Sequence, residues 1–141
     1  RTGLKYLYMK NEVKELSYSF GVDIVKHHSK IAGRGAPSLG LQLLRSGTAV
    51  GALYREAEYA QSRADFINKL SVARKECNES LYWLRLLHDT DFIVSSDYKL
   101  LSQKAGSLLN LLTAIIQTTR ANTPKPTPRS IRNPSSVICH L

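Results

Sequence analysis

The sequence predicts an all-α protein, an antiparallel up-down four-helix bundle followed by a disordered or extended C-terminal tail. Apolar residues recur every three or four positions in four long segments, and no segment alternates apolar and polar residues as a strand does. Short connections separate the four segments, which favours antiparallel neighbours. A chain of 141 residues is sized for one domain with a substantial core.

The first predicted helix runs from Lys10 to about Gly33, after an N-terminal extension of residues 1–9. Its side chains are spaced as one inward helix face requires. This face comprises Val13, Leu16, Phe20, Ile24, His27 and Ile31. Gly33, Gly35 and Pro37 then end the helix, because glycine favours a helix C-terminus and proline cannot continue it.

The second predicted helix begins at Ser38 and ends near Ala60. Its inward face comprises Leu43, Gly47, Val50, Tyr54 and Ala57. Gly47 and Gly51 each lower helix propensity by about 1 kcal/mol relative to alanine. That cost is understandable if another helix passes close by. We therefore interpret both glycines as helix-packing positions, because the Gly-Lys-Ser/Thr of a phosphate loop does not follow them.

The third predicted helix opens with a capping box, Ser62 and Asp65. The Ser62 hydroxyl is expected to accept from the Asp65 amide, while the Asp65 carboxylate reaches back. The inward face comprises Phe66, Leu70, Ala73, Cys77, Leu81, Leu84 and Leu87. Asp89-Thr-Asp91 ends this helix.

The fourth predicted helix is capped by Ser95 or Ser96 and completes a bundle of residues 10–121. Its inward face comprises Tyr98, Leu101, Ala105, Leu108, Leu112, Ile115 and Thr119. Residues 122–141 contain four prolines among basic and hydroxyl residues, which predicts a basic tail without helix. Its last residues, 137–141, are apolar.

The chain carries a net charge of +9, of which residues 1–9 contribute +2 and residues 122–141 contribute +3. The remaining +4 makes the bundle mildly basic, which permits a polyanionic partner without requiring one. No apolar run approaches the roughly 20 residues of a membrane helix, and no signal peptide is recognisable. We therefore expect a cytoplasmic protein, with Cys77 and Cys139 as free thiols.

Residue patterns for catalysis or metal binding are missing from the sequence. A di-iron bundle needs Glu-x-x-His pairs, and none occurs. The Glu-x-x-Glu pairs, Glu12 with Glu15 and Glu76 with Glu79, fit solvated faces, and His27 fits a hydrogen-bonded core histidine. No nucleophile elbow or phosphate loop is present. We predict no enzyme activity, no cofactor and no metal.

Basic side chains provide the candidate nucleic-acid contacts. Three of them are spaced by four and form a ridge, and four others lie on the next two helices. The set is Lys26, Lys30, Arg34, Arg45, Arg55, Arg74 and Lys75. Such cations bind phosphates without reading sequence. The alternative is an ordinary solvated surface, and a symmetric oligomer would repeat each ridge into a continuous field.

A second set of apolar residues falls outside the inward faces and forms a candidate oligomer interface. It comprises Tyr18, Val22, Val25, Tyr82, Trp83 and Leu86. A monomeric bundle needs only one apolar stripe per helix, so this surplus favours self-association. Partial burial beneath neighbouring side chains is the alternative.

Several motifs between Gln42 and Leu87 together resemble one family. They are Leu44-Arg-Ser-Gly-Thr48, Gly51, Glu56-Ala-Glu58, Ser62-x-Ala-Asp-Phe66 and Glu76-x-x-Glu-x-x-x-Trp-Leu84. The chain, from near Met9 to Asn122, resembles the bacterial four-helix-bundle proteins encoded in intervening sequences of 23S ribosomal RNA genes. These proteins were once called S23 ribosomal proteins.

The resemblance implies a left-handed bundle that commonly assembles as a homopentameric ring. The accessory proteins of diversity-generating retroelements look like relatives, and they bind nucleic acid and a reverse transcriptase as basic pentameric barrels. This chain departs from the family at Gly51-Ala-Leu-Tyr-Arg-Glu56, where Leu53 replaces an asparagine and Arg55 a small residue. Any function carried by that asparagine is therefore in doubt here.

Together the cations, the surplus apolar residues and the resemblance predict a homo-oligomeric module that binds RNA or DNA non-specifically. It would serve as an accessory to an RNA- or retroelement-related process. A protein–protein scaffold without a nucleic-acid role is the alternative.

Overall fold

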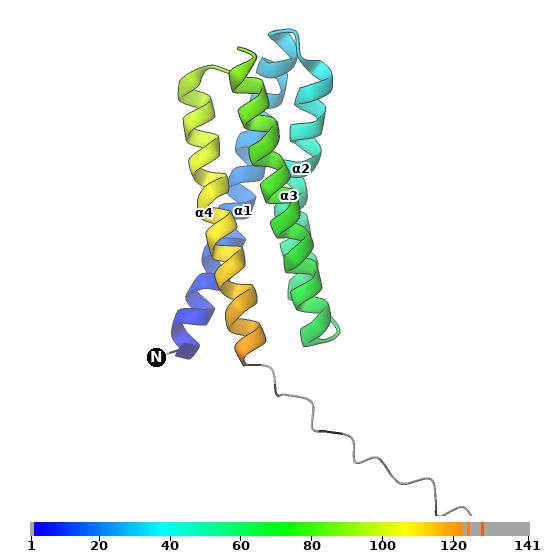
Figure 1. Cartoon of the computed structure of the whole chain (residues 1–141), viewed down its shortest axis with the longest axis vertical. Coiled ribbons are helices and arrows are strands. Elements are labelled where there is room, and N and C mark those ends of the chain that lie inside the picture. Colours follow the sequence, from blue (N-terminus) through cyan, green and yellow to red (C-terminus); the bar gives the residue numbers. More distant parts are fainter. Residues whose placement is uncertain (1, 123, 125–127, 129–141) are drawn as a thin grey trace, which may run out of the picture.

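The computed structural model describes residues 2–122 together with Pro124 and Pro128. It contains four helices in chain order, α1 (Thr2–Gly33), α2 (Pro37–Glu58), α3 (Arg63–Asp89) and α4 (Ser95–Ala121). They run up and down side by side, so that the N-terminus and the end of α4 lie at the same end of the bundle (Figure 1). The predicted all-α four-helix bundle is confirmed.

Each helix packs against two neighbours. Contacts join α1 to α2, α2 to α3, α3 to α4 and α4 back to α1, so α1 lies diagonally across from α3. The four inward faces meet in one apolar core that contains most of the predicted residues, with Phe20, Leu43, Leu84 and Leu112 among the fully buried side chains. Leu16, Phe66, Leu81 and Tyr98 are only partly buried at its edge.

Helix α1 begins earlier than the sequence predicts, at Thr2 rather than Lys10. Residues 2–9 therefore continue the bundle instead of forming a separate extension. The Tyr6 hydroxyl lies 2.7 Å from Thr119 Oγ1 on α4, and Met9 packs against the core. The start was hard to predict because Leu4, Leu7 and Tyr8 remain exposed and blur the apolar period.

Helix ends differ in detail from the predictions. Proline is the first residue of α2, a position where its missing N–H costs nothing. Neither Ser95 nor Ser96 caps α4, because the N-cap position is Val94, in extended backbone and without a side-chain cap. The Ser62 hydroxyl accepts from the Asp65 amide at 3.0 Å, and the Asp65 carboxylate accepts from the Gln61 amide at 3.2 Å.

Among the described residues, no helix combines the length and hydropathy needed to cross a membrane. The predicted tail lies outside these residues from Thr123 onward, except for Pro124 and Pro128, and so do its apolar end and Cys139.

Candidate functional site

The predicted basic ridge lies along the last turns of α1. Lys26 and Lys30 are exposed there, one helical turn apart. Arg34 lies just past the helix end and donates from Nη2 to the carbonyl oxygen of Asp91, at 3.2 Å. Arg34 thus fastens the α1–α2 connection to the α3–α4 connection. All three ridge residues are exposed, and Arg34 is the one whose guanidinium is engaged in this contact.

The other four predicted cations lie on different sides of the bundle. Arg55 reaches toward α1 from α2, whereas Arg45 lies on the side of α2 that faces α3. Arg74 and Lys75 lie on α3, which is diagonal to α1. One subunit therefore does not bring the seven cations into a single surface.

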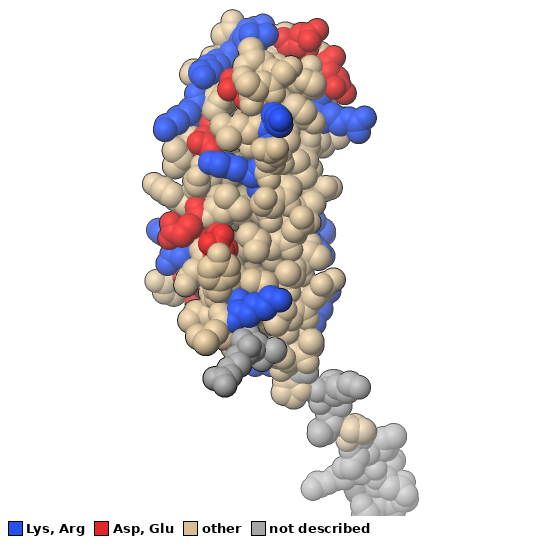
Figure 2. Space-filling view, turned by 90° about the vertical axis from the view of Figure 1, so that its left-hand side faces the viewer, with Lys and Arg blue, Asp and Glu red and all other residues tan. Residues whose placement is uncertain are grey.

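The side of the bundle formed by α1 and α4 shows the same dispersion. Figure 2 shows Lys and Arg side chains set apart on this side, with Asp and Glu among them, beside a broad uncharged strip. Residues 105–119 of α4 contain no charged residue, which explains why charge is sparse on that helix.

Among the described residues, ion pairing with acids engages four Lys and Arg side chains, all of them outside the predicted set. Within residues 2–122, acids pair with Lys14, Lys69, Arg85 and Lys104, as in Lys14 Nζ to Glu58 at 3.5 Å and Lys69 Nζ to Glu56 at 3.3 Å. None of the seven predicted cations forms an ion pair within this part of the chain. Lys26, Lys30 and Arg55 are therefore exposed cations whose charge is available to an external anion.

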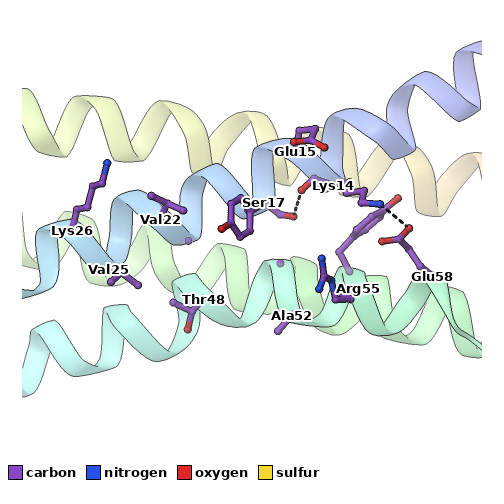
Figure 3. Close-up of a pocket in the computed structure, with 14 residues that line it drawn as sticks. Lys14, Glu15, Ser17, Val22, Val25, Lys26, Thr48, Ala52, Arg55 and Glu58 are labelled. Atoms are coloured by element: carbon purple, nitrogen blue, oxygen red, sulfur yellow. Dashed lines mark hydrogen bonds and ion pairs between the residues drawn. The ribbon is translucent and has the colours of Figure 1, made fainter.

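An apolar groove of about 750 Å³ runs between α1 and α2. Tyr18, Val22 and Val25 of α1 line it, opposite Thr48 and Ala52 of α2. Figure 3 shows Arg55 rising from α2 toward α1, whereas Lys26 and Glu15 leave α1 on the side away from α2. At the right-hand end of the groove in Figure 3, Lys14 is paired with Glu58.

Two glycines give the groove its shape. A β-carbon on Gly51 would lie 3.3 Å from the backbone oxygen of Ser17, so α1 and α2 approach closely at that point. A β-carbon on Gly21 would meet nothing within 4 Å, so its missing side chain leaves open space in the groove. Gly51 thus permits close packing, and Gly21 keeps the surface above it hollow.

The predicted interface residues fall into two separate sets. Tyr18 and Val25 belong to the α1–α2 groove and are 70% and 56% exposed. The second set, Tyr82, Trp83 and Leu86, lies on α3, and we call it the α3 patch. Tyr82 is 59% exposed, whereas Trp83 and Leu86 are half-buried. Partial burial beneath neighbouring side chains therefore explains the apolar surplus at Trp83 and Leu86, but not at the exposed Tyr18 and Val25.

Trp83 has a fixed orientation in the α3 patch. Its Nε1 donates to Glu79 Oε1 at 3.0 Å, and its ring meets the Tyr82 ring edge-on with centroids 5.1 Å apart. The patch is thus an aromatic surface with a carboxylate attached to it.

Two motifs that the sequence presents separately meet between α2 and α3. Arg45 and Ser46 of α2 face Glu76 and Glu79 of α3 across a shallow groove. Partial burial and the nearby Glu79 carboxylate raise the pKa of Glu76, while Arg45 opposes that shift. Beneath them the Ser80 hydroxyl donates to Ser46 Oγ at 2.9 Å, a buried contact that the apolar period could not reveal.

Two buried titratable side chains, His27 and Cys77, form contacts within the bundle. His27 donates from Nδ1 to the Asp23 carbonyl at 2.7 Å, and its Nε2 lies 3.4 Å from Asp97. Burial raises the pKa of the Cys77 thiol to about 12, and its Sγ donates to the Ala105 carbonyl. In the described part of the chain, no three His, Cys, Asp or Glu side chains gather closely enough to hold a metal ion.

Comparison with known proteins agrees with this architecture. A solved structure from Bacteroides thetaiotaomicron VPI-5482, described as a protein with unknown function from the S23 ribosomal protein family, is 44% identical. The match covers 77% of this chain and 98% of the other, with a TM-score of 0.74. No curated protein matches. The family model of the 23S rRNA-intervening sequence protein matches residues 9–114, and the chain therefore belongs to that family.

Proposed function

We propose that this protein is a non-enzymatic, homo-oligomeric and ring-forming module that binds nucleic acid through its phosphates, in an RNA- or retroelement-related process. One observation carries the proposal: Lys26 and Lys30 are exposed one turn apart on α1 and form no ion pair within residues 2–122. Cations already paired with carboxylates have less to offer a phosphate, so these two lysines are the natural contacts.

Assembly matters to this proposal because one subunit disperses its cations. Each subunit of a ring would add its own Lys26 and Lys30, and the repeated pairs would form a longer basic surface. Such a surface binds by counterion release, so its affinity depends on charge and salt and hardly on sequence. A reverse transcriptase would be a protein partner of the same assembly, as in the retroelement accessory proteins.

Filter binding with a structured RNA and a duplex DNA tests the proposal. Affinity should be similar for unrelated sequences and fall steeply between about 50 and 200 mM salt, since the log–log slope is about −0.9 per phosphate contact. Lys26→Gln with Lys30→Gln should lower the steepness of that slope by about one per lysine removed and per subunit engaged.

Lys69→Gln is the matched control, because the Lys69 ammonium is already paired with Glu56, at 3.3 Å. It should bind almost as the parent does. No retention of either nucleic acid at low salt would overturn the proposal, and so would equal losses for the α1 pair and for Lys69.

A protein–protein scaffold is the second candidate function, favoured by the exposed apolar groove between α1 and α2. In that case the oligomer would hold another protein, and the cations would be solvated surface. The assay above separates the two functions, because a scaffold without a nucleic-acid role leaves both probes unbound at every salt concentration.

A further inference from the structure

The groove between α1 and α2 is concave and apolar between charged borders, where Glu58 is paired with Lys14, and Glu15 and Lys26 leave α1 on the side away from α2 (Figure 3). Its walls are Tyr18, Val22 and Val25, and Arg55 stands in it without a carboxylate partner within the described residues. A surface of this kind is best filled by a convex apolar group that brings a negative charge with it.

The α3 patch of the same chain has the complementary form. Tyr82 projects from it, Trp83 lies beside Tyr82, and Leu86 is one turn above. Glu79 is held on the edge of this aromatic surface by the Trp83 indole. Glu76 lies nearby, with Arg45 across the shallow α2–α3 groove and Lys75 one turn before Glu79 as the neighbouring cations. The patch is therefore an exposed aromatic surface with the Glu79 carboxylate fixed on it.

We propose that the α1–α2 groove of one subunit receives the α3 patch of a second copy, with Glu79 of the incoming copy beside Arg55. The contact is heterologous, because the two surfaces differ and lie on different helices. The inference deepens the proposed function, since it rests on the homo-oligomer and names the surfaces that build it.

The two symmetric alternatives are less favourable. Two grooves facing each other would leave their concave walls unfilled and bring Arg55 against Arg55. Two α3 patches facing each other would bring Glu76 and Glu79 of both copies together, and like charges across an interface are destabilising. Only the head-to-tail arrangement matches shape and charge in one contact.

The size of the groove and the symmetry of the contact indicate what kind of assembly the contact would form. The groove is lined by 14 residues, whereas a standard interface engages roughly 20–30 residues on each side. The groove would thus form the apolar centre, and neighbouring turns of α1 and α2 would form the rim. A head-to-tail contact leaves one groove and one patch free at the ends of the assembly, and repetition closes into a ring when the rotation between neighbouring copies divides a full turn.

Two variants that block opposite halves of the contact provide the test. Gly21→Glu fills the groove and places a carboxylate near the incoming Glu79, and its side chain starts in open space, so the fold should survive. Tyr82→Lys removes an exposed ring from the α3 patch and repels Arg55. The control is Gly106→Glu on α4, where a β-carbon also meets nothing within 4 Å.

Sedimentation velocity should show the parent and Gly106→Glu as oligomers, and each blocked variant as a folded monomer of about 15.8 kDa. A mixture of the two blocked variants should form a heterodimer of twice that mass and nothing larger. Each variant keeps one intact half, so a single contact can form and the chain of contacts stops there.

A blocked variant that assembles as the parent does overturns the pairing, and so does a mixture that stays monomeric. Either result leaves the nucleic-acid proposal standing. A parent that assembles and passes the mixing test but binds no nucleic acid would remove the proposed function and leave this inference. A monomeric parent would remove both.

Discussion

Gly47 of α2 lies directly against Ile24 of α1: a β-carbon on Gly47 would stand 2.8 Å from Ile24 Cγ1. Gly40 and Gly51 face α1 in the same way, at 3.1 Å from Ile31 Cγ2 and 3.3 Å from the Ser17 backbone oxygen. The three glycines are spaced by seven and four residues, so they form one stripe. This stripe sets how closely the first two helices pack, and so sets the floor of the groove above them.

Enlarging Gly47 should separate α1 from α2. Alanine gains about 1 kcal/mol of helix propensity, but its β-carbon must displace a fully packed Ile24, and leucine must displace more. We expect Gly47→Leu to lower the free energy of unfolding by about 1–3 kcal/mol or more, as overpacked cores do. Urea denaturation measures this loss, and sedimentation measures the accompanying loss of assembly.

Gly21→Ala is the matched control for this substitution. Its β-carbon enters open space, so only helix propensity changes, and the variant should be up to about 1 kcal/mol more stable. A Gly47→Leu protein with the melting curve and oligomer size of the parent would show that the close approach has no energetic role.

The buried hydroxyl pair Ser46 and Ser80 should couple α2 to α3. Ser80 donates to Ser46 Oγ or to the Glu76 carbonyl, both at 2.9 Å, in a site without solvent. Removing one hydroxyl leaves its partner less satisfied, so each single alanine variant should cost about 1–2 kcal/mol. The double variant should cost less than the sum by about 0.5–1.5 kcal/mol, measured by urea denaturation as a double-mutant cycle.

Ser46 with Ser71 supplies the control cycle. Ser71 bonds only within α3, to the Ile67 carbonyl at 2.7 Å, and has no partner on α2 among the described residues. Its alanine variant should add independently to Ser46→Ala. Additive behaviour of Ser46 with Ser80 as well would mean that the contact between the two hydroxyls contributes nothing.

The fold was predictable from the sequence because burial and period coincide over most of each helix. Val13, Phe20 and Ile24 fall on one face at helical spacing, and all three are buried. The spacing of apolar residues does not reveal polar side chains that are buried through a hydrogen bond to each other, so the burial of Ser80 was not predicted. It also failed at the N-terminus, where Tyr6 belongs to the bundle through a hydroxyl contact with a residue 113 positions away.

The candidate surfaces were predictable only in part. Spacing puts Lys26 and Lys30 on one side of α1, but it cannot say which helices flank that side. The contact of Arg34 with the α3–α4 connection and the separation of Lys75 from α1 therefore emerge only from the fold. The groove likewise depends on Gly21, because the open space around this residue leaves the surface hollow, and that space is visible only in the fold.

The contact between Tyr6 and Thr119 predicts that the first turns of α1 stabilise the bundle. Tyr6→Phe removes one hydroxyl, while Thr119 keeps its bond to the Ile115 carbonyl at 2.7 Å, so the loss should be about 0.5–1.5 kcal/mol. A chain that begins at Lys10 should lose more, because the partly buried Tyr6 ring and Met9 also leave the core. Thermal denaturation compares both with Tyr8→Phe, at an exposed ring that should be neutral. If the shortened chain were as stable as the parent, residues 2–9 would be an extension that does not stabilise the bundle.

The buried Tyr54 hydroxyl should make the bundle sensitive to alkali. Burial, and then the nearby Glu58 carboxylate and Tyr6, raise the pKa of Tyr54 from its ordinary 10.0 to about 12, and its hydroxyl donates to the Lys10 carbonyl at 2.8 Å. Between these two pH values the unfolded chain has lost the proton that the folded chain retains, so the free energy of unfolding falls as pH rises. The contribution is fully present below about pH 10, and it is lost progressively up to about pH 12, at no more than about 1.4 kcal/mol per pH unit.

Tyr54→Phe isolates this effect. The variant loses the bond to Lys10 at neutral pH, but its stability should fall less steeply than that of the parent above pH 10. Burial raises the pKa of Cys77 as well, and because both proteins carry Cys77 its effect cancels in the comparison. Tyr59→Phe, at a side chain 85% exposed, should keep the parent's slope. Urea denaturation at pH steps from 8 to about 11.5 measures the three proteins, and parallel curves for the parent and Tyr54→Phe would mean that Tyr54 titrates alike in the folded and unfolded chains.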